Sequence, residues 1–394
     1  MRSPLTAPSP VPRLSRRAAL RTLTASAAAC TWPAMARAST ATASDTAPTP
    51  PTLRLLAHSS LPAGGTFQKT PIGGLSALAY DARTQLWYAL SDDRGTHAPA
   101  RCYVLRLPGF DTGQPLRPEW VRVITLTDAR GQPFARAAVD PEGLALRHNP
   151  ANGQTTLLWS SEGRIRAGQP PALYESTLDG RLLRQLTLPT HLREVRRMGR
   201  GPRNNQAFEG LSLSPDGRHA WAAMEGALAQ DIGPKLPGLL AAPCRITRFE
   251  LASGRADQQR AYQPEPLPLG PNRPHGPAEY GIAEILMRDP EHLWVLERAW
   301  TPLTGLSAKL YEAHLPGATD TLPKPALRGR RIQPMAKRLL LDLQHCGLPH
   351  VDNFEAMAWG PPLPSGNRTL LMCTDDGFNT LQVTQFAAFE VIEP

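Results

Sequence analysis

The chain has 394 residues, of which 41% are hydrophobic and 20% are charged, and its formal net charge is +9. Six arginines and no acidic residue fall within residues 1–38, so without that segment the charge drops from +9 to +3, which excludes a nucleic-acid-binding footprint. The 42 prolines and 31 glycines argue against long helices and favour many short strands with tight turns.

The first 38 residues resemble an export signal. Arg16 and Arg17 form a twin-arginine pair, a stretch rich in Ala, Leu and Thr follows, and Ala36-Arg37-Ala38 is a small-x-small cleavage site. We expect residues 1–38 to be a twin-arginine-type signal peptide and the mature protein to be periplasmic or secreted; the alternative is a disordered basic tail. Residues 39–52 are rich in Thr, Ala and Pro and predict a flexible linker before the domain, residues 53–394.

Residues 205–226 predict two short strands joined by a turn. Residues 209–213 alternate apolar with small or polar side chains, residues 215–217 read Pro-Asp-Gly, and residues 220–224 return as an apolar run. In an antiparallel pair the start of the first strand and the end of the second lie at one edge. Glu209 and Glu225 are therefore predicted to be near neighbours.

The same pattern occurs five times. Its copies begin near residues 74, 142, 209, 282 and 355. The steps between them are roughly 68, 67, 73 and 73 residues, and a near-constant period of this length indicates a repeat architecture. Four repeats carry two further strand-like runs, whereas the last carries one before the chain ends. An unpaired strand near Leu53 would complete the last repeat.

These counts predict an all-β fold, a β-propeller of five blades with four strands each. The strand near Leu53 and the C-terminal strands would share one blade, which closes the ring and removes the free sheet edge. Six blades remain an alternative if a long loop contains another one. No apolar run approaches the ~20 residues that span a bilayer, so no transmembrane segment is expected.

In a propeller, the first strand of each blade lines the central channel. Strand starts and second-strand ends should then meet at one mouth of the channel. Two arginines, Arg94 and Arg298, are expected there among eleven acids. These acids are Asp92, Asp93, Glu142, Glu162, Glu209, Glu225, Glu284, Glu297, Glu355, Asp375 and Asp376.

So many carboxylates raise one another's pKa unless they are paired, and a hard cation such as Ca²⁺ would neutralise them. The predicted metal ligands are Glu142, Glu209, Glu284 and Glu355. The alternative is that several acids only accept hydrogen bonds from backbone N–H groups at turns. The sequence has no Gly-x-Ser-x-Gly, Walker or His-Glu-x-x-His motif. Four cysteines after residue 38 either form disulfides or are buried as free thiols.

As an ordered set, several of these segments resemble the phytase-like family, also described as the "esterase-like activity of phytase" domain. The resemblance covers about residues 53–394 and departs from the usual pattern at Ala356, where Gly is common. The matching segments are residues 73–76, 91–95, 140–144, 205–211, 281–285 and 352–357. The resemblance implies hydrolysis of phosphoesters or other esters. Five-bladed calcium-dependent nucleotidases are a looser likeness.

The first hypothesis is an exported, Ca²⁺-assisted hydrolase of a small anionic or ester substrate. Asp93 or Glu225 would accept the proton of the attacking water, and Arg94 or Arg298 would bind the anionic substrate. The second hypothesis is a non-catalytic propeller that binds a ligand or protein. A sugar lactone hydrolase on a calcium propeller is a third.

Overall fold

The structure is a computed structural model that describes residues 49–62, 64–110, 113–233, 242–266, 279–302 and 304–394. The predicted signal peptide and residues 39–48 of the predicted linker lie outside these ranges. The described residues belong to one compact unit, Thr49–Pro394.

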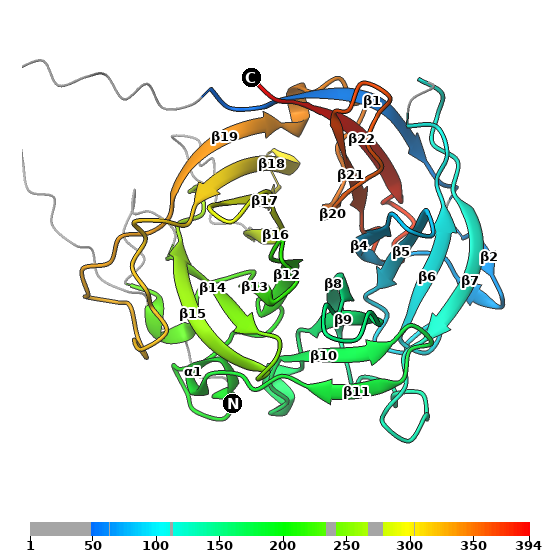
Figure 1. The fold of residues 1–394 in the computed structure, drawn as a ribbon. Coiled ribbons are helices and arrows are strands. Elements are labelled where there is room, and N and C mark those ends of the chain that lie inside the picture. The colour runs from blue at the N-terminus through cyan, green and yellow to red at the C-terminus, as the bar shows by residue number, and fades with distance from the viewer. Residues whose placement is uncertain (1–48, 63, 111–112, 234–241, 267–278, 303) are drawn as a thin grey trace, which may run out of the picture. The chain divides into compact units, whose positions relative to one another are not determined.

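Five four-stranded antiparallel sheets are arranged in a ring (Figure 1), as the repeats predict. Here the channel means the central axis that the first strands of the blades surround. Blade 1 consists of β4 (Leu75–Asp81), β5 (Leu86–Ser91), β6 (Arg101–Arg106) and β7 (Glu119–Thr125). Blade 2 consists of β8 (Pro141–His148), β9 (Thr155–Ser161), β10 (Ala172–Thr177) and β11 (Leu182–Gln185). Blade 3 consists of β12 (Phe208–Leu213), β13 (His219–Met224), β14 (Cys244–Glu250) and β15 (Arg255–Tyr262).

Blade 4 consists of β16 (Glu279–Met287), β17 (His292–Thr301), β18 (Gly305–His314) and β19 (Ala336–Asp342). Blade 5 combines β20 (Phe354–Trp359), β21 (Arg368–Thr374) and β22 (Gln385–Ile392) with β1 (Thr52–Ser60). A small ribbon pairs β2 (Thr66–Phe67) with β3 (Thr70–Pro71). The helices are a four-residue α1 (Thr190–Arg193) and the 3-10 turns η1 (Ile165–Ala167), η2 (Ala229–Asp231) and η3 (Leu343–His345).

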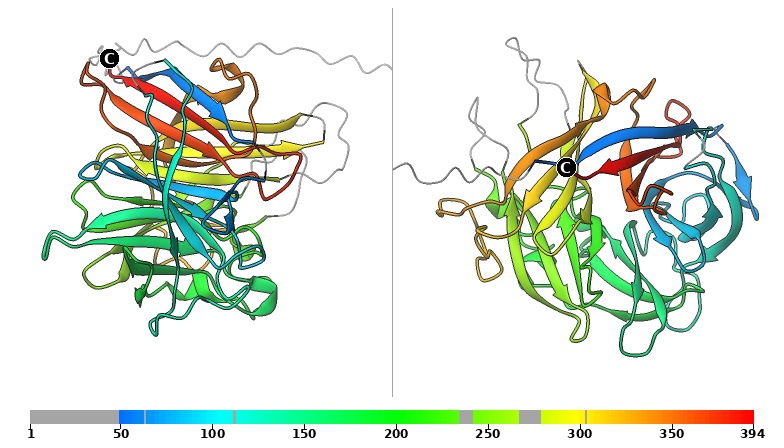
Figure 2. Two further views of the ribbon diagram at one scale, coloured as in Figure 1. Left: turned by 90° about the vertical axis from the view of Figure 1, so that its right-hand side faces the viewer. Right: turned by 45° about the horizontal axis from the view of Figure 1, so that its top comes forward.

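The two ends of the described chain meet in blade 5. β1 pairs antiparallel with β22, with Thr52 opposite Ile392 and Ser60 opposite Gln385. Figure 2 shows the two strands side by side. The predicted closure is thereby confirmed, and β22 has no free edge because β1 covers it.

The apolar runs of the strands are buried on both sheet faces. The core divides into five hydrophobic clusters, one between each pair of neighbouring blades. Trp159 of blade 2, for example, belongs to the same cluster as Tyr88 of blade 1, and Leu158 belongs to the same cluster as Phe249 of blade 3. The four described cysteines are free, and three of them are fully buried in these clusters, as the free-thiol alternative requires.

Glycines on the inner strands let neighbouring blades approach closely. A Cβ added at Gly143 would lie 2.5 Å from the carbonyl oxygen of Glu209 on the next blade. One added at Gly210 would lie 2.6 Å from the backbone nitrogen of Ile285. No real Cβ tolerates such contacts, so these positions need a residue without a side chain.

Each inner strand has a β-bulge near its first residue, where its register against the second strand shifts. The shifts lie between Leu75 and Ala77, Pro141 and Leu144, Phe208 and Leu211, Ile282 and Glu284, and Phe354 and Ala356. A bulge leaves a residue unpaired and redirects its side chain. The bulged residues at equivalent positions are Ser76, Glu142, Glu209, Ala283 and Glu355.

Candidate functional site

Three of the four predicted metal ligands occupy the same place in their blades. Glu142, Glu209 and Glu355 are the bulged residues of β8, β12 and β20, and each is less than a tenth exposed. Glu284 lies one residue after the equivalent position, which is Ala283. Its Oε1 accepts hydrogen bonds from the backbone N–H of Leu211 (2.8 Å) and of its own neighbour in sequence (2.9 Å). The structure therefore places Glu284 between blades 3 and 4, apart from the other three.

A second row of acids follows the second strands. Asp92, Glu162, Glu225 and Asp375 directly follow β5, β9, β13 and β21. Their N–H groups donate to the residues just before the inner strands, so all four lie at the channel mouth. In blade 4 the equivalent residue is Arg298, which pairs with Gly281.

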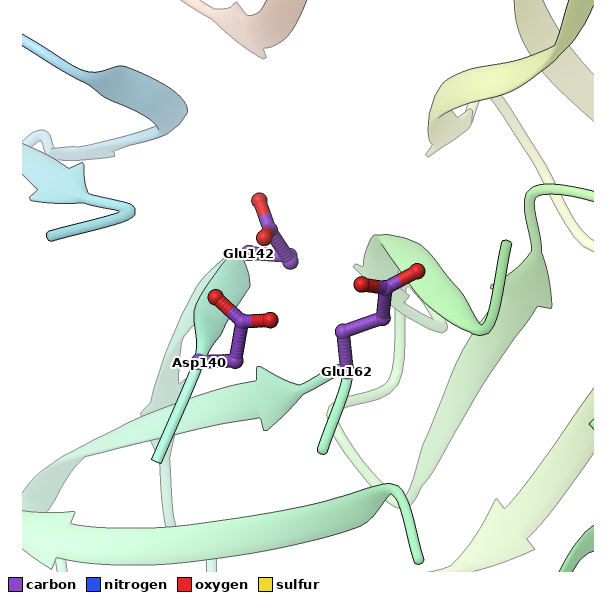
Figure 3. Close-up of side chains that lie close together, drawn as sticks. All are labelled: Asp140, Glu142 and Glu162. Carbon is purple, nitrogen blue, oxygen red and sulfur yellow. The ribbon is translucent and has the colours of Figure 1, made fainter. Parts of the chain in front are cut away.

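The acids of blades 2 and 3 approach one another most closely. Asp140, Glu142 and Glu162 each offer one carboxylate oxygen, and these oxygens lie within 4.8 Å of one another (Figure 3). Glu162, Glu209 and Glu225 form a second group with the same spacing. We call these five residues the acid cluster. It contains the predicted neighbours Glu209 and Glu225.

Asp140 was not among the predicted site residues. It directly precedes β8, whereas the prediction considered residues inside inner strands and after second strands. The carbonyl oxygen of Asp140 accepts the N–H of Glu162 at 2.9 Å, which fixes it at the mouth. The sequence signal is an acid immediately before the first residue of an inner strand.

Two arginines form ion pairs with acids of the cluster, but its five carboxylates outnumber these two positive charges. Arg94 Nε donates to Asp140 Oδ1 at 2.6 Å, and Arg298 donates to Glu225 Oε1 and contacts Glu355 Oε1, both at 3.0 Å. The second oxygens, Asp140 Oδ2 and Glu225 Oε2, are buried and have no hydrogen-bond partner. Buried polar atoms are almost always paired, so two such oxygens make this cluster a candidate site for a cation.

Burial and neighbouring carboxylates raise the pKa of the acids at the channel mouth. Burial, with the charge of other acids added, raises the pKa of Asp92 and of Glu162 to about 8. It raises the pKa of Glu225 to about 7, against the opposing effect of Arg298. Glu142 and Glu209 also have a pKa well above the ordinary value, because both are buried and each is near other acids. A cation would reverse these shifts by favouring the ionised forms.

Other acids near the mouth have structural partners. Asp93 accepts from the N–H groups of Thr96 (2.7 Å) and Ala98 (2.8 Å) and from buried Arg101 (2.7 Å). Both of its oxygens are thereby engaged.

The side chains of Asp376 and Glu297 also accept hydrogen bonds from nearby protein groups. Asp376 accepts from the N–H groups of Gly74 (2.9 Å) and Phe378 (3.0 Å). Glu297 accepts from the hydroxyl of Tyr262 at 2.6 Å. The alternative that acids serve backbone and side-chain bonding at turns therefore describes these residues, and it also applies to Glu162, whose Oε1 accepts the N–H of Ala207 at 2.8 Å.

The raised pKa values predict a pH-dependent stability of the cation-free protein. A carboxyl group whose folded pKa exceeds its unfolded pKa adds stability at low pH, and this stability is lost as pH rises through the folded value. We expect the melting temperature in chelator to fall by several degrees between pH 5 and pH 8. Differential scanning calorimetry across this range measures the slope. Glu225→Gln should flatten it, and a melting temperature that rises with pH would contradict the pKa shifts.

The closed ring and the acids at its mouth define the class: a five-bladed β-propeller with a buried carboxylate cluster at one channel opening. The chain belongs to the phytase-like family, because the family model described as "Esterase-like activity of phytase" matches residues 70–378. This span includes all five inner strands and the whole acid cluster.

One similar protein matches a limited part of the chain. An uncharacterized secreted protein of Arthroderma benhamiae is 31% identical over 112 residues, which are 25% of this chain and 22% of that protein. The chain thus matches about a fifth of that relative's length.

Similar solved structures include the catalytic domain of a GH62 alpha-L-arabinofuranosidase of Coprinopsis cinerea. Its TM-score is 0.44 at 7% identity, over 87% of this chain and 97% of that one. Another is the Dos1 propeller, with a TM-score of 0.36 at 7% identity, over 81% of this chain and 68% of that one. Neighbours at this level of similarity do not indicate an activity for this chain. Within the described residues, no helix has the length and apolar character that a bilayer crossing needs.

Proposed function

We propose that the protein is an exported, cation-assisted hydrolase of phosphorylated or other ester substrates, with Ca²⁺ bound at the acid cluster. The observation that supports it most is the pair of buried, unpartnered oxygens on Asp140 and Glu225. Five carboxylates face two arginines there, so the cluster has an excess of negative charge. A family named for esterase-like activity of phytase is consistent with such chemistry.

The residues present fit a hard cation. Ca²⁺ binds oxygen ligands at about 2.3–2.6 Å, so two oxygens on opposite sides of the ion lie about 5 Å apart. The oxygens of Asp140, Glu142 and Glu162 lie within 4.8 Å of one another. We assign the cation to these three residues together with Glu209, which belongs to the adjoining group. When bound, it would polarise a phosphoryl or carbonyl oxygen and lower the pKa of a water molecule.

The remaining residues have separate roles in this proposal. Glu225 accepts the proton of the attacking water, because its Oε2 is buried without a hydrogen-bond partner and a bound cation would favour the ionised carboxylate that a general base requires. Arg298 positions Glu225 and Glu355, because it bonds both and its side chain is only 16% exposed. Arg94, with a side chain 42% exposed, is the arginine open to an anionic substrate. Asp93 supports the adjoining loop through the bonds described above.

Export through the twin-arginine machinery is part of the proposal. It rests on Arg16, Arg17 and the cleavage pattern that ends at Ala38. The relative from Arthroderma benhamiae carries the description secreted, which agrees with this location. A periplasmic or secreted site of action would also provide millimolar Ca²⁺ to an oxygen-only ligand set.

Chelation tests the proposed function. Protein treated with EDTA should lose at least 100-fold of its rate on a phosphate monoester or a carboxylic ester, and added Ca²⁺ should restore it, since the cation would polarise the phosphoryl or carbonyl oxygen of the substrate. Steady-state kinetics with p-nitrophenyl phosphate, p-nitrophenyl acetate and a sugar lactone measure this.

Each outcome of that test separates the hypotheses. A rate that survives exhaustive chelation contradicts cation assistance. Turnover of the lactone alone favours the lactone hydrolase. Calorimetric Ca²⁺ binding without turnover of any of the three substrates favours the non-catalytic propeller.

A further inference from the structure

Two basic loops adjoin the acid cluster on the same face of the propeller. The first loop joins β9 to β10 and starts directly after Glu162. The second joins β11 to β12 and ends two residues before Glu209. Arg166 N–H donates to Asn204 Oδ1 at 3.3 Å, which connects the loops. Arg94 donates to Asn205 at 3.2 Å, which connects the second loop to the residue that holds Asp140.

The loops enclose a groove rich in arginine. Its lining residues, which we call the arginine groove, are Gly168, Pro170, Arg193, Glu194, Val195, Arg196 and Arg197. Arg164 and Arg166 stand on the first loop beside it, and these two are exposed, as are the three arginines that line the groove. Arg200 and Arg203 of the second loop are half-buried. Within the described part of the chain, none of the five exposed arginines has a carboxylate oxygen within 4.0 Å. The one acid of the groove, Glu194, is bonded instead to Arg200 at 3.0 Å.

The arginines sit on a loop whose backbone is fixed. Gly201 N–H donates to Gln230 Oε1 at 2.7 Å, and its carbonyl accepts Ala229 N–H at 2.9 Å. Gly201 has a φ of 80°, and a Cβ there would lie 1.9 Å from the carbonyl oxygen of Glu194, so the turn requires glycine. Arg203 donates to the carbonyl of Ala227 at 2.9 Å. The backbone that follows the groove arginines is therefore anchored beside the channel mouth.

Clustered guanidinium groups repel one another, and the repulsion is relieved when an anion binds between them. Guanidinium forks match phosphate oxygens in charge and geometry. The guanidinium groups of the groove attract an anion without needing the cation, against the repulsion from the neighbouring acid cluster. The same guanidinium groups offer nothing to a neutral ester beyond single hydrogen bonds.

We propose that the arginine groove is an anion-binding subsite that holds a phosphate group of a phosphorylated small molecule beside the channel mouth. The inference rests on the proposed function, because it takes the substrates of that hydrolase to be phosphorylated molecules and not neutral esters. It differs from that function in that the subsite works without the cation and without the acid cluster.

Calorimetric titration of the protein with inorganic pyrophosphate, in EDTA and at low ionic strength, tests the subsite. The wild type should bind, and the triple variant Arg193→Gln/Arg196→Gln/Arg197→Gln should bind at least 10-fold more weakly. The matched control removes three exposed arginines at or near the opposite ends of the strands, Arg106, Arg181 and Arg218. It should bind like the wild type, and so should Glu209→Gln.

Several results would overturn the subsite. The first is that the wild type does not bind pyrophosphate. The others are that both triple variants lose the same affinity for pyrophosphate, or that Glu209→Gln binds it more weakly than the wild type. Binding to anionic phosphatidylglycerol vesicles without binding to pyrophosphate would also overturn it, in favour of a membrane contact. Failure of this test alongside Ca²⁺-dependent hydrolysis would leave the proposed function intact, whereas pyrophosphate binding without hydrolysis would leave only the subsite.

Discussion

Replacement of Glu209 by glutamine is expected to lower the rate of ester hydrolysis at least 100-fold and to weaken Ca²⁺ binding at least 10-fold. Glu209 is the bulged residue of β12 and belongs to the acid group with Glu162 and Glu225. The substitution keeps the size of the side chain but removes the charge that a hard cation requires. Steady-state kinetics and calorimetric Ca²⁺ titration measure the two effects.

Glu284→Gln is the matched control for this experiment. Glu284 is also a glutamate of an inner strand, but its Oε1 accepts two backbone N–H groups between blades 3 and 4. An amide oxygen can accept the same bonds, so both rate and affinity should stay near the wild-type values. Equal losses in Glu209→Gln and Glu284→Gln would contradict the assignment of the cation to the acid cluster.

Deletion of β1 is expected to have the largest effect on stability. The strand covers the edge of β22 along its whole length, and Ala57 belongs to the cluster between blades 1 and 5. Without residues 52–60 the ring has an open sheet edge and an exposed apolar surface. We expect the melting temperature to fall by more than 10 °C and the protein to aggregate, as measured by differential scanning fluorimetry and light scattering.

A circular permutant separates strand pairing from chain order. Because Thr52 lies opposite Ile392, a short linker can join the C-terminal end of β22 to β1 as a hairpin. New termini between β1 and β2 then keep all four strands of blade 5. This permutant should retain the wild-type melting temperature. A deletion variant as stable as the wild type would show that β1 does not close the ring.

The fold was predictable because each repeat carries its own signals. Apolar runs bounded by turn residues recur at a nearly constant period, and a missing strand at one end matches a spare strand at the other. The structure confirms five blades and the shared blade 5. The proximity of Glu209 and Glu225 was also predictable, because it follows from antiparallel pairing alone.

The position of Glu284 relative to the β-bulge of blade 4 was not predictable. Gly281-Ile282-Ala283-Glu284 looks like the Glu-Gly-Leu pattern of blades 2 and 3, yet the bulge of β16 places Ala283, not Glu284, at the equivalent position. A one-residue shift of register has no sequence marker, although it moves a side chain from the channel to the blade interface. In blade 4 the position that an acid occupies at the mouth of the other blades is taken by Arg298. Glu297 lies one residue earlier, opposite Ile282.

Crystals soaked in a Ca²⁺ analogue with strong anomalous scattering, such as a lanthanide, test the central claim most directly. An anomalous difference map should show an ion within ligand distance of Asp140, Glu142 and Glu162, next to Glu209. A map whose peaks all lie on the outer surface, with none at the channel mouth, would contradict the account.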